Sequence, residues 1–468
     1  MKIGLVSPAW DVMVNSYPPL GLGYLAASLR REGHEVKIFD FGLRPGMEPD
    51  QEADEVVGFK PDLVGITVWT HLYYHSLELA REIKCRNLNI PIVLGGPHIT
   101  VYPLTAFEDG LIDYTIYGEG EETIVELVQS LEGKIAREEI RGLCYRNSGS
   151  AVKNDPRPFI TDLDSLPLPA RDLLEVKKYP LRSNEGEPMT TILTSRGCPY
   201  SCIYCFKGLF GKKYREKSAL QVVNEIEQVR QQEGIQNFYF VDDLFVFNRN
   251  RLHQIISLLK EREIKIKWQC LARVDKLKKE DYPLMAEAGC YGIHFGIETG
   301  NEEIMKQIGK HITLDQVRKA VGWAREAGIR TKGYFMIGLP GDTKATIRQT
   351  LEFAIDIDLD EAMFSLTTPL PGTELWEMAR KKEGGLSERE AFSQAFYFTA
   401  GQADLKPLSN LSGGLSDEEL VRFAQQAPGI FWKRCLRKRE FRERFGYYLG
   451  SLVYGVSLLS RLRAKGRY

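Results

Sequence analysis

Short apolar runs alternate with amphipathic stretches through most of the chain, the pattern expected when buried strands alternate with helices that cover a sheet. In the first part of the chain, helical periodicity extends over residues 22–31 and 73–86. We therefore predict an α/β fold that begins with a flavodoxin-like (Rossmann-like), doubly wound sheet of five parallel strands. Its strands are expected at residues 3–7, 36–39, 63–67, 92–94 and 114–117.

A second series of strands and helices begins near residue 190. Its six units predict a partial (β/α)6 TIM-type barrel, a fold in which functional residues lie at the C-terminal ends of the strands. Strands are expected at residues 191–194, 237–241, 267–271, 292–296, 331–337 and 362–366, with helices at 219–233, 252–263, 314–327 and 344–357.

The segment between the two series, and the end of the chain, have a different character. A hairpin around Asn147-Ser148-Gly149 and the closely spaced prolines after it predict an extended linker. Near the end, Ser416-Asp417-Glu418-Glu419 is typical of a helix start, so we expect a helical C-terminal region. The predicted domains are 1–140 for the first sheet, 141–185 for the hairpin and linker, 186–382 for the barrel and 383–468 for the C-terminal region.

Lys and Arg number 62 against 63 Asp and Glu in 468 residues, a formal net charge of -1. This balance argues against a general nucleic-acid-binding protein, which would be basic. The chain begins without the basic start and long apolar core of a signal peptide. We therefore expect a cytoplasmic protein whose thiols stay reduced and form no disulfides.

Three of the eight cysteines, Cys198, Cys202 and Cys205, lie close together in the loop after the first strand of the second series. Thiolates at this spacing can hold a four-iron cluster that leaves one iron open for a substrate or cofactor. Zinc binding or redox use is the alternative, although no Cys or His lies between residues 206 and 250 to supply a local fourth ligand. We interpret the other cysteines as small buried apolar residues.

With these three cysteines, the chain resembles the radical S-adenosylmethionine (SAM) superfamily over roughly residues 1–381. The motif Cys198-x-x-x-Cys202-x-x-Cys205 carries the resemblance. It implies that the three cysteines bind a 4Fe-4S cluster as catalytic and metal residues, and that SAM binds at its open iron. The acidic residues proposed for SAM could equally cap a helix or lie solvated at a strand end. The cofactor residues that the resemblance implies in the barrel are Asp242 or Asp243 for the amine, Glu298 for the ribose, Arg273, and Gly338 beside the adenine.

The N-terminal half resembles the cobalamin-binding domain of one branch of that superfamily, through turns at the carboxyl ends of its strands. Glycine in such turns lets the backbone approach a flat ligand. No histidine occurs before His34, so the resemblance implies cobalamin without a histidine lower ligand, and we interpret His71, His75, His98 and His294 as polar residues rather than metal ligands. The implied cobalamin-binding residues are Pro18, Leu20, Gly21, Thr67, Gly95, Gly96, Pro97, His98, Gly118, Glu119, Gly120 and Glu121.

The activity implied by the resemblance is methylation of an unactivated carbon through a 5'-deoxyadenosyl radical and methylcobalamin. The alternatives are a cyclase or rearrangement enzyme that uses the same cofactors, and a cobalamin or redox sensor. Methylthiotransfer to tRNA would need a further cysteine triad in the first domain, where residues 1–133 contain only Cys85.

The expected partners are a small-molecule or lipid-like substrate and an electron donor such as flavodoxin or ferredoxin, with no nucleic acid. Basic residues flank an apolar run at residues 447–459, which is shorter than the roughly 20 residues that span a bilayer. This tail is compatible with peripheral contact to an anionic membrane, or with a helical cap over the active site.

Overall fold

The structure is a computed structural model that describes residues 1–10, 17–108, 110–382, 391–392 and 406–445. It divides into two compact units, the first comprising residues 1–292 and 369–396 and the second residues 293–368 and 397–468. This division into two units does not test the domain limits expected from the sequence, which stay a prediction.

A seven-stranded sheet with the order β2-β1-β3-β4-β5-β6-β7 forms the first part of unit 1. Strands β1 to β5 are parallel, which confirms the five predicted strands. The predicted hairpin, β6 and β7, is also present and extends the sheet by two antiparallel strands. The strands are β1 (Lys2–Ser7), β2 (Glu35–Asp40), β3 (Leu63–Thr67), β4 (Ile92–Gly95), β5 (Tyr114–Ile116), β6 (Leu143–Asn147) and β7 (Ser150–Lys153).

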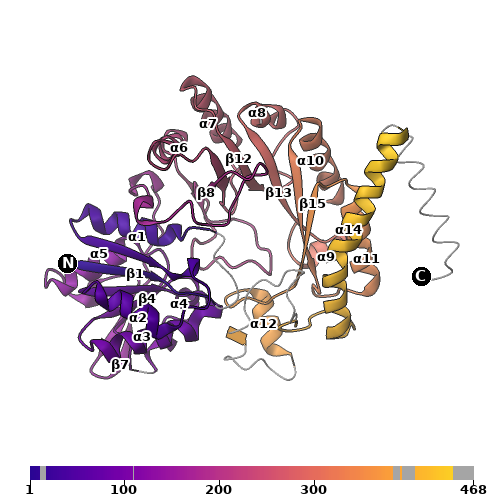
Figure 1. Ribbon diagram of the computed structural model, residues 1–468. Helices are drawn as coiled ribbons and strands as arrows, with labels where there is room; N and C mark the ends of the chain where they lie inside the picture. Colours follow the sequence, from indigo (N-terminus) through magenta and orange to yellow (C-terminus); the bar gives the residue numbers. More distant parts are fainter. Residues whose placement is uncertain (11–16, 109, 383–390, 393–405, 446–468) are drawn as a thin grey trace. The chain divides into compact units, whose positions relative to one another are not determined.

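Helices cover both faces of this sheet. Figure 1 shows α1 and α5 on one face and α2 and α3 on the other. Because both faces are covered, consecutive residues of β1 such as Leu5 and Val6 are buried. The helices are α1 (Leu20–Arg31), α2 (Pro49–Gly58), α3 (Tyr73–Arg86), α4 (Pro97–Val101) and α5 (Glu121–Leu131), with 3-10 turns η1 (Phe41–Leu43), η2 (Thr70–Leu72), η3 (Thr105–Phe107) and η4 (Arg137–Glu139).

The rest of unit 1 contains the start of the second βα series. Strand β11 (Asn237–Phe240) pairs in parallel with β8 (Met189–Ile192) and with β12 (Lys267–Ala272). Two short antiparallel strands, β9 (Ser195–Arg196) and β10 (Arg215–Glu216), enclose the loop that carries the three clustered cysteines. The helices and turns are η5 (Leu163–Ser165), η6 (Arg171–Leu173), α6 (Ala219–Glu233), α7 (Arg249–Glu261), α8 (Asp281–Glu287) and α12 (Glu374–Lys381).

Strand β13 (Cys290–Glu298) carries the chain from the first unit into the second. In unit 2, β14 (Arg330–Ile337) and β15 (Glu361–Leu366) form a parallel pair, against which α14 (Asp417–Phe445) packs. The predicted start of this last helix is confirmed, because the Ser416 hydroxyl accepts a hydrogen bond from the Glu419 amide. The remaining helices are α9 (Glu302–Gln307), α10 (Leu314–Glu326) and α11 (Lys344–Asp356).

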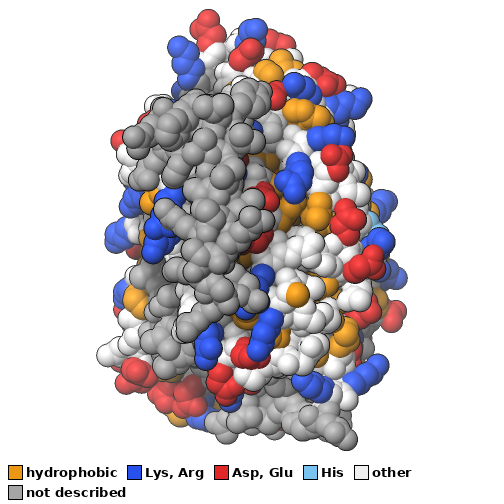
Figure 2. Space-filling model, turned by 90° about the vertical axis from the view of Figure 1, so that its right-hand side faces the viewer, with side chains coloured by type: hydrophobic (Ala, Val, Ile, Leu, Met, Phe, Trp, Pro, Cys, Tyr) orange, Lys and Arg blue, Asp and Glu red, His pale blue; other side chains and the backbone are white. Residues whose placement is uncertain are grey.

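The predicted apolar run at 447–459 lies outside the described residues. Within the part of the chain that is described, no helix is long and apolar enough to cross a membrane. On the face drawn in Figure 2, basic and acidic side chains of described residues are interspersed rather than gathered by sign.

Candidate functional site

A cavity of about 550 Å³ lies at the carboxyl ends of β1, β3, β4 and β5 in unit 1, and its wall is mostly apolar. All the residues predicted to bind cobalamin line it, with the exception of His98. Leu193, Arg196, Leu209 and Phe210, which lie near or within the cysteine loop, complete the wall. The strand ends of the first sheet and the surroundings of the cysteine loop therefore enclose one space.

Glycines shape the wall of this cavity. Gly96 has φ +101°, and a Cβ atom there would lie 3.0 Å from atoms of Thr67 and Val68, so β3 and β4 end in close contact. A Cβ atom on Gly21 or Gly118 would meet no protein atom within 4 Å. These positions leave open space along the wall, which fits a broad, flat ligand such as a corrin ring.

Two histidines lie near the strand ends, but only one of them lines the cavity. His98 is fully buried, its ring centroid lies 4.3 Å from that of Tyr73, and neither ring nitrogen has a hydrogen-bond partner. Burial lowers its pKa to about 3, so the ring is neutral. His71, which the sequence analysis set aside, lines the cavity from η2 with its ring 4.6 Å from that of Trp10.

Glu119 and Glu121 form buried ion pairs with two arginines at the base of the cysteine loop. Glu119 accepts hydrogen bonds from Arg196 and Arg215, each at 2.9 Å, and from the backbone amide of Ile160 at 2.7 Å. Glu121 accepts a further bond from Arg196 at 2.5 Å. Both carboxylates border the cavity. Because their partners Arg196 and Arg215 lie in β9 and β10, these ion pairs hold the β9–β10 pair against the first sheet.

The cysteine loop is tightly folded at its start. Gly197 has φ +84°, and a Cβ atom there would lie 2.4 Å from the carbonyl oxygen of Lys213, so only glycine fits before Cys198. The Cys205 amide donates to the Cys202 carbonyl at 3.2 Å, and the Leu375 amide of α12 donates to the Ile203 carbonyl at 3.0 Å. The loop is thus anchored from both sides.

The three thiols are partly buried and surrounded by opposing charges. Burial, followed by the negative charge of Asp243, raises the pKa of Cys205 to about 12, whereas Lys207 lowers it. Burial also raises the pKa of Cys198, again against the influence of Lys207. Among the described residues, no three His, Cys, Asp or Glu side chains converge on one point as ligands of a single metal ion. Cysteines that each bind a different iron of a cluster do not need to converge in that way.

Lys207 provides a direct test of whether this site fits an anionic cofactor. Its ammonium nitrogen is buried and has no hydrogen-bond partner. A buried cation without a partner is costly, so the site is incomplete without an anion beside Lys207. A cluster held by the three thiolates, together with the carboxylate of SAM, would supply negative charge of this kind. The residues present therefore fit the group that the sequence predicts.

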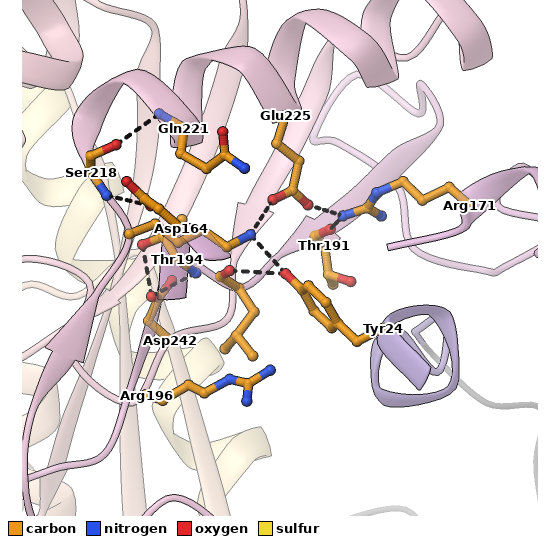
Figure 3. A network of polar contacts seen from close by, with 12 residues as sticks. Tyr24, Asp164, Arg171, Thr191, Thr194, Arg196, Ser218, Gln221, Glu225 and Asp242 are labelled. Atoms are coloured by element: carbon orange, nitrogen blue, oxygen red, sulfur yellow. Dashed lines mark hydrogen bonds and ion pairs between the residues drawn. The ribbon is translucent and has the colours of Figure 1, made fainter. Parts of the chain in front are cut away.

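The two neighbouring aspartates have different surroundings. One carboxylate oxygen of Asp242 accepts bonds from the Thr194 amide at 2.9 Å and the Thr194 hydroxyl at 2.8 Å (Figure 3). The same oxygen accepts a bond from the Ser195 hydroxyl at 2.6 Å. Asp242 therefore joins the end of β11 to the turn after β8. The side chain of Asp243 remains accessible to solvent, but the protein around its carboxyl group desolvates it, and this desolvation, followed by the negative charge of Asp242, raises its pKa. Asp243 also raises the pKa values of Cys198 and Cys205 through its negative charge, while the assignment of either aspartate to SAM stays a prediction.

Arg273, at the end of β12, packs against the cysteine loop. The centre of its guanidinium lies 3.6 Å from the ring centroid of Tyr200, a cation–π contact, and its Nε donates to Asp275 at 2.9 Å. This arrangement supports the loop directly, while contact between Arg273 and SAM stays a prediction.

The remaining predicted residues lie in unit 2. Glu298 is buried with φ +72°, and its carboxylate accepts a 2.9 Å bond from the ammonium of Lys310. Gly338 has φ +90°, and its amide donates to the buried carboxylate of Asp342 at 3.0 Å. Asp342 thereby fixes the turn after β14, and the proposed contacts of Glu298 and Gly338 with SAM stay predictions.

A second buried polar network in unit 1 connects helix α1, which lines the cavity, with the second βα series (Figure 3). The ammonium of Lys217 donates to the hydroxyl of Tyr24 at 2.8 Å and to Glu225 at 2.7 Å. Glu225 also accepts a 2.8 Å bond from Arg171, which in turn bonds the carbonyl of Thr191 in β8. Sequence analysis singled out none of these residues, because their partners are distant along the chain.

Together the doubly wound sheet with its cavity and the βα series with its three-cysteine loop define a cobalamin-binding domain joined to a radical SAM domain. Residues 9–128 match the B12 binding domain, and residues 192–354 match the Radical SAM superfamily. The chain belongs to the cobalamin-dependent branch of the radical SAM superfamily, as the resemblance predicted.

Among its relatives, the uncharacterized methyltransferase PH0819 of Pyrococcus horikoshii is 39% identical over 386 residues, covering 81% of this chain and 83% of the relative. The anaerobic magnesium-protoporphyrin IX monomethyl ester cyclase of Rubrivivax gelatinosus is 29% identical over 378 residues, covering 78% and 67%. Among solved structures, the radical SAM methyltransferase TsrM of Kitasatospora setae, with cobalamin and a 4Fe-4S cluster bound, has the same fold. Its TM-score is 0.70, with 21% identity over 91% of this chain and 90% of that one.

The family membership confirms several predictions. The protein is a radical SAM enzyme, and its cofactors are a 4Fe-4S cluster, SAM and cobalamin. The fold is the predicted combination of a Rossmann-like domain and a partial barrel. The identity of each cofactor ligand, and the absence of a histidine below the cobalt, stay predictions.

Proposed function

We propose that the protein is a C-methyltransferase that transfers a methyl group to an unactivated carbon of a small-molecule or lipid-like substrate. The observation that carries this proposal is that one cavity in unit 1 is bordered both by the cobalamin-type strand ends and by residues of the cysteine loop. A methyl donor and a radical generator held at one cavity suit methyl transfer to a substrate radical. The relationship to a methyltransferase over four fifths of the chain supports this choice.

When bound, the cluster and SAM supply a 5'-deoxyadenosyl radical and methylcobalamin supplies the methyl group. Cys198, Cys202 and Cys205 would hold the cluster as thiolates. Because burial and Asp243 raise the pKa of Cys205, its proton must leave as the metal binds, so cluster assembly depends on pH. Asp243 would accept hydrogen bonds from the amine of SAM, and the apolar wall of the cavity would exclude water from the radical.

A radical SAM cyclase or rearrangement enzyme is the second candidate, favoured by the relationship to the ester cyclase. It would use the same two domains without consuming a methyl group. In either case we propose an electron donor of the flavodoxin or ferredoxin type. Peripheral contact between the C-terminal tail and a membrane is a further proposal, based on the basic residues that flank residues 447–459.

The test uses the full chain, reconstituted anaerobically with iron, sulfide and cobalamin, then reduced and supplied with SAM. Methyl transfer predicts both 5'-deoxyadenosine and S-adenosylhomocysteine, whereas cyclisation or rearrangement predicts 5'-deoxyadenosine alone. Neither product, with both cofactors in place, would indicate a sensor and refute the proposal.

Cys198→Ala is the matching variant. It should lose the visible absorption of the cluster and all SAM cleavage, while its far-ultraviolet circular dichroism stays that of the wild type. The interpretation of the other cysteines as buried is wrong for Cys85, which is exposed. Cys85→Ala therefore changes an exposed cysteine outside the loop, and as the control it should retain both the absorption and SAM cleavage.

A further inference from the structure

Lys207 lies two residues after Cys205, in a part of the loop whose backbone is fixed. Its carbonyl oxygen accepts a 2.8 Å hydrogen bond from the Gly211 amide. The ammonium nitrogen at the end of its side chain is buried and has no hydrogen-bond partner. A lysine on a loop can normally extend its charged end into water, so a buried and unpaired ammonium indicates a missing anion.

The Lys207 ammonium lies within electrostatic reach of groups that are negatively charged when ionised. Lys207 acts electrostatically on Cys198, Cys205 and Asp243, and in each case it favours the charged form of the partner. None of the three forms a hydrogen bond with the ammonium nitrogen itself. The anion that completes the site is therefore expected to be a group bound by the three cysteines, and not a further side chain of the protein.

We propose that the ammonium of Lys207 lies against the cluster held by Cys198, Cys202 and Cys205, and that it stabilises the reduced cluster. This inference rests on the proposed role of the cysteines. Reduction adds one electron, taken from a low-potential flavin or iron-sulfur protein, and no proton, so the cluster becomes more negative by one charge. A fixed positive charge at its edge favours that state and raises the reduction potential.

The test is a redox titration of the reconstituted full chain in the absence of SAM, with the reduced cluster followed by electron paramagnetic resonance. Lys207→Met should titrate at a more negative potential. At the potential that reduces half of the wild-type cluster, its reduced fraction should fall by roughly twofold or more. Lys207→Arg, which keeps the charge, should stay close to the wild type. Lys212→Met, which removes an exposed lysine of the same loop, is the control and should not shift.

Iron and sulfide content, measured first, separates the possible failures. A wild type without iron and sulfide would refute the cysteine assignment. If all proteins carry the cluster and Lys207→Met titrates with the wild type, the inference about Lys207 is wrong while the proposed function stands. Weaker SAM binding in that variant, without any shift in potential, would assign Lys207 to the carboxylate of SAM and would also overturn the inference. If Lys207→Met fails to retain the cluster, Lys207→Gln provides the same comparison.

Discussion

Replacing Glu119 by glutamine should destabilise unit 1 strongly, because this carboxylate lies between two buried guanidinium groups. The side chains of Glu119 and Arg215 are each 2% exposed, and that of Arg196 is 4% exposed. The substitution keeps the size of the side chain and one acceptor oxygen. It removes the negative charge and places an amide group where hydrogen-bond donors already converge.

The loss in free energy of unfolding depends on which buried charges keep a charged partner in the variant. Arg196 retains Glu121 at 2.5 Å, so its charge stays compensated. Arg215 loses its charged partner and keeps only neutral acceptors, among them the carbonyl oxygens of Phe210 and Ile160. Leaving one buried charge without its partner costs about 3–5 kcal/mol, and the remaining carbonyl contacts favour the lower end, about 3 kcal/mol. This is a large part of the 5–15 kcal/mol or so that stabilises a typical domain.

The assay is urea unfolding of the metal-free full chain, followed by circular dichroism, together with hydrogen exchange of peptides from residues 195–217. Glu122→Gln is the control, because Glu122 is 55% exposed and its pair with Arg157 should contribute about 1 kcal/mol or less. Equal urea midpoints for the two variants, with unchanged exchange in the loop, would refute the view that Glu119 anchors β9 and β10.

Three further outcomes are expected. Gly197→Ala should lower cluster content and raise protease sensitivity of the loop, because its Cβ would lie 2.4 Å from a backbone oxygen; normal iron content would contradict this. Asp243→Asn should weaken SAM binding by about tenfold or more in equilibrium dialysis, since a charged hydrogen bond contributes about 1.5–3 kcal/mol. Asp242→Asn should leave SAM binding nearly unchanged, because its carboxylate is bonded within the protein, and the reverse order would exchange the two roles. Burial alone would raise the pKa of Asp281, but the hydrogen bond from Arg249, then those from the Lys278 amide and His253, lower it below its unfolded value. The contribution of Asp281 to stability is therefore present at neutral pH and is lost as pH falls through the folded pKa. The urea midpoint of the wild type should fall more steeply with acid than that of Asp281→Asn, and parallel curves would contradict this.

The fold could be predicted because its signals are local. Each parallel strand of the first sheet is a short apolar run, since helices cover both faces, and the turns that follow are rich in glycine. The hairpin was also predicted, but not its addition to the sheet, because the pairing of β6 with β5 joins segments that the intervening α5 separates in sequence. The sequence pattern of a strand does not identify its neighbour.

The site was predicted less completely, and the reason is again distance along the chain. The cysteines and the cavity-lining glycines are visible as motifs. Arg196, in contrast, finds its partner Glu119 at a separation of 77 residues, and Lys217 finds Tyr24 at 193. The resemblance assigned Glu119 to cobalamin and either Asp242 or Asp243 to the amine of SAM, whereas in the structure Glu119 and Asp242 accept hydrogen bonds from other protein groups.

These long-range pairs join the cavity of unit 1 to the cysteine loop. Both buried networks run from residues that line the cavity, Glu119 and Tyr24, to residues that flank the cysteine loop, Arg215 and Lys217. Buried ion pairs are not the most stabilising way to join two surfaces, since well-packed apolar residues often do as well or better. They do fix geometry, because each bond satisfies a charge only at one distance and direction. The cavity and the cysteine loop are therefore expected to keep a constant separation, as the proposed transfer of a methyl group from a donor in the cavity to a substrate radical would require.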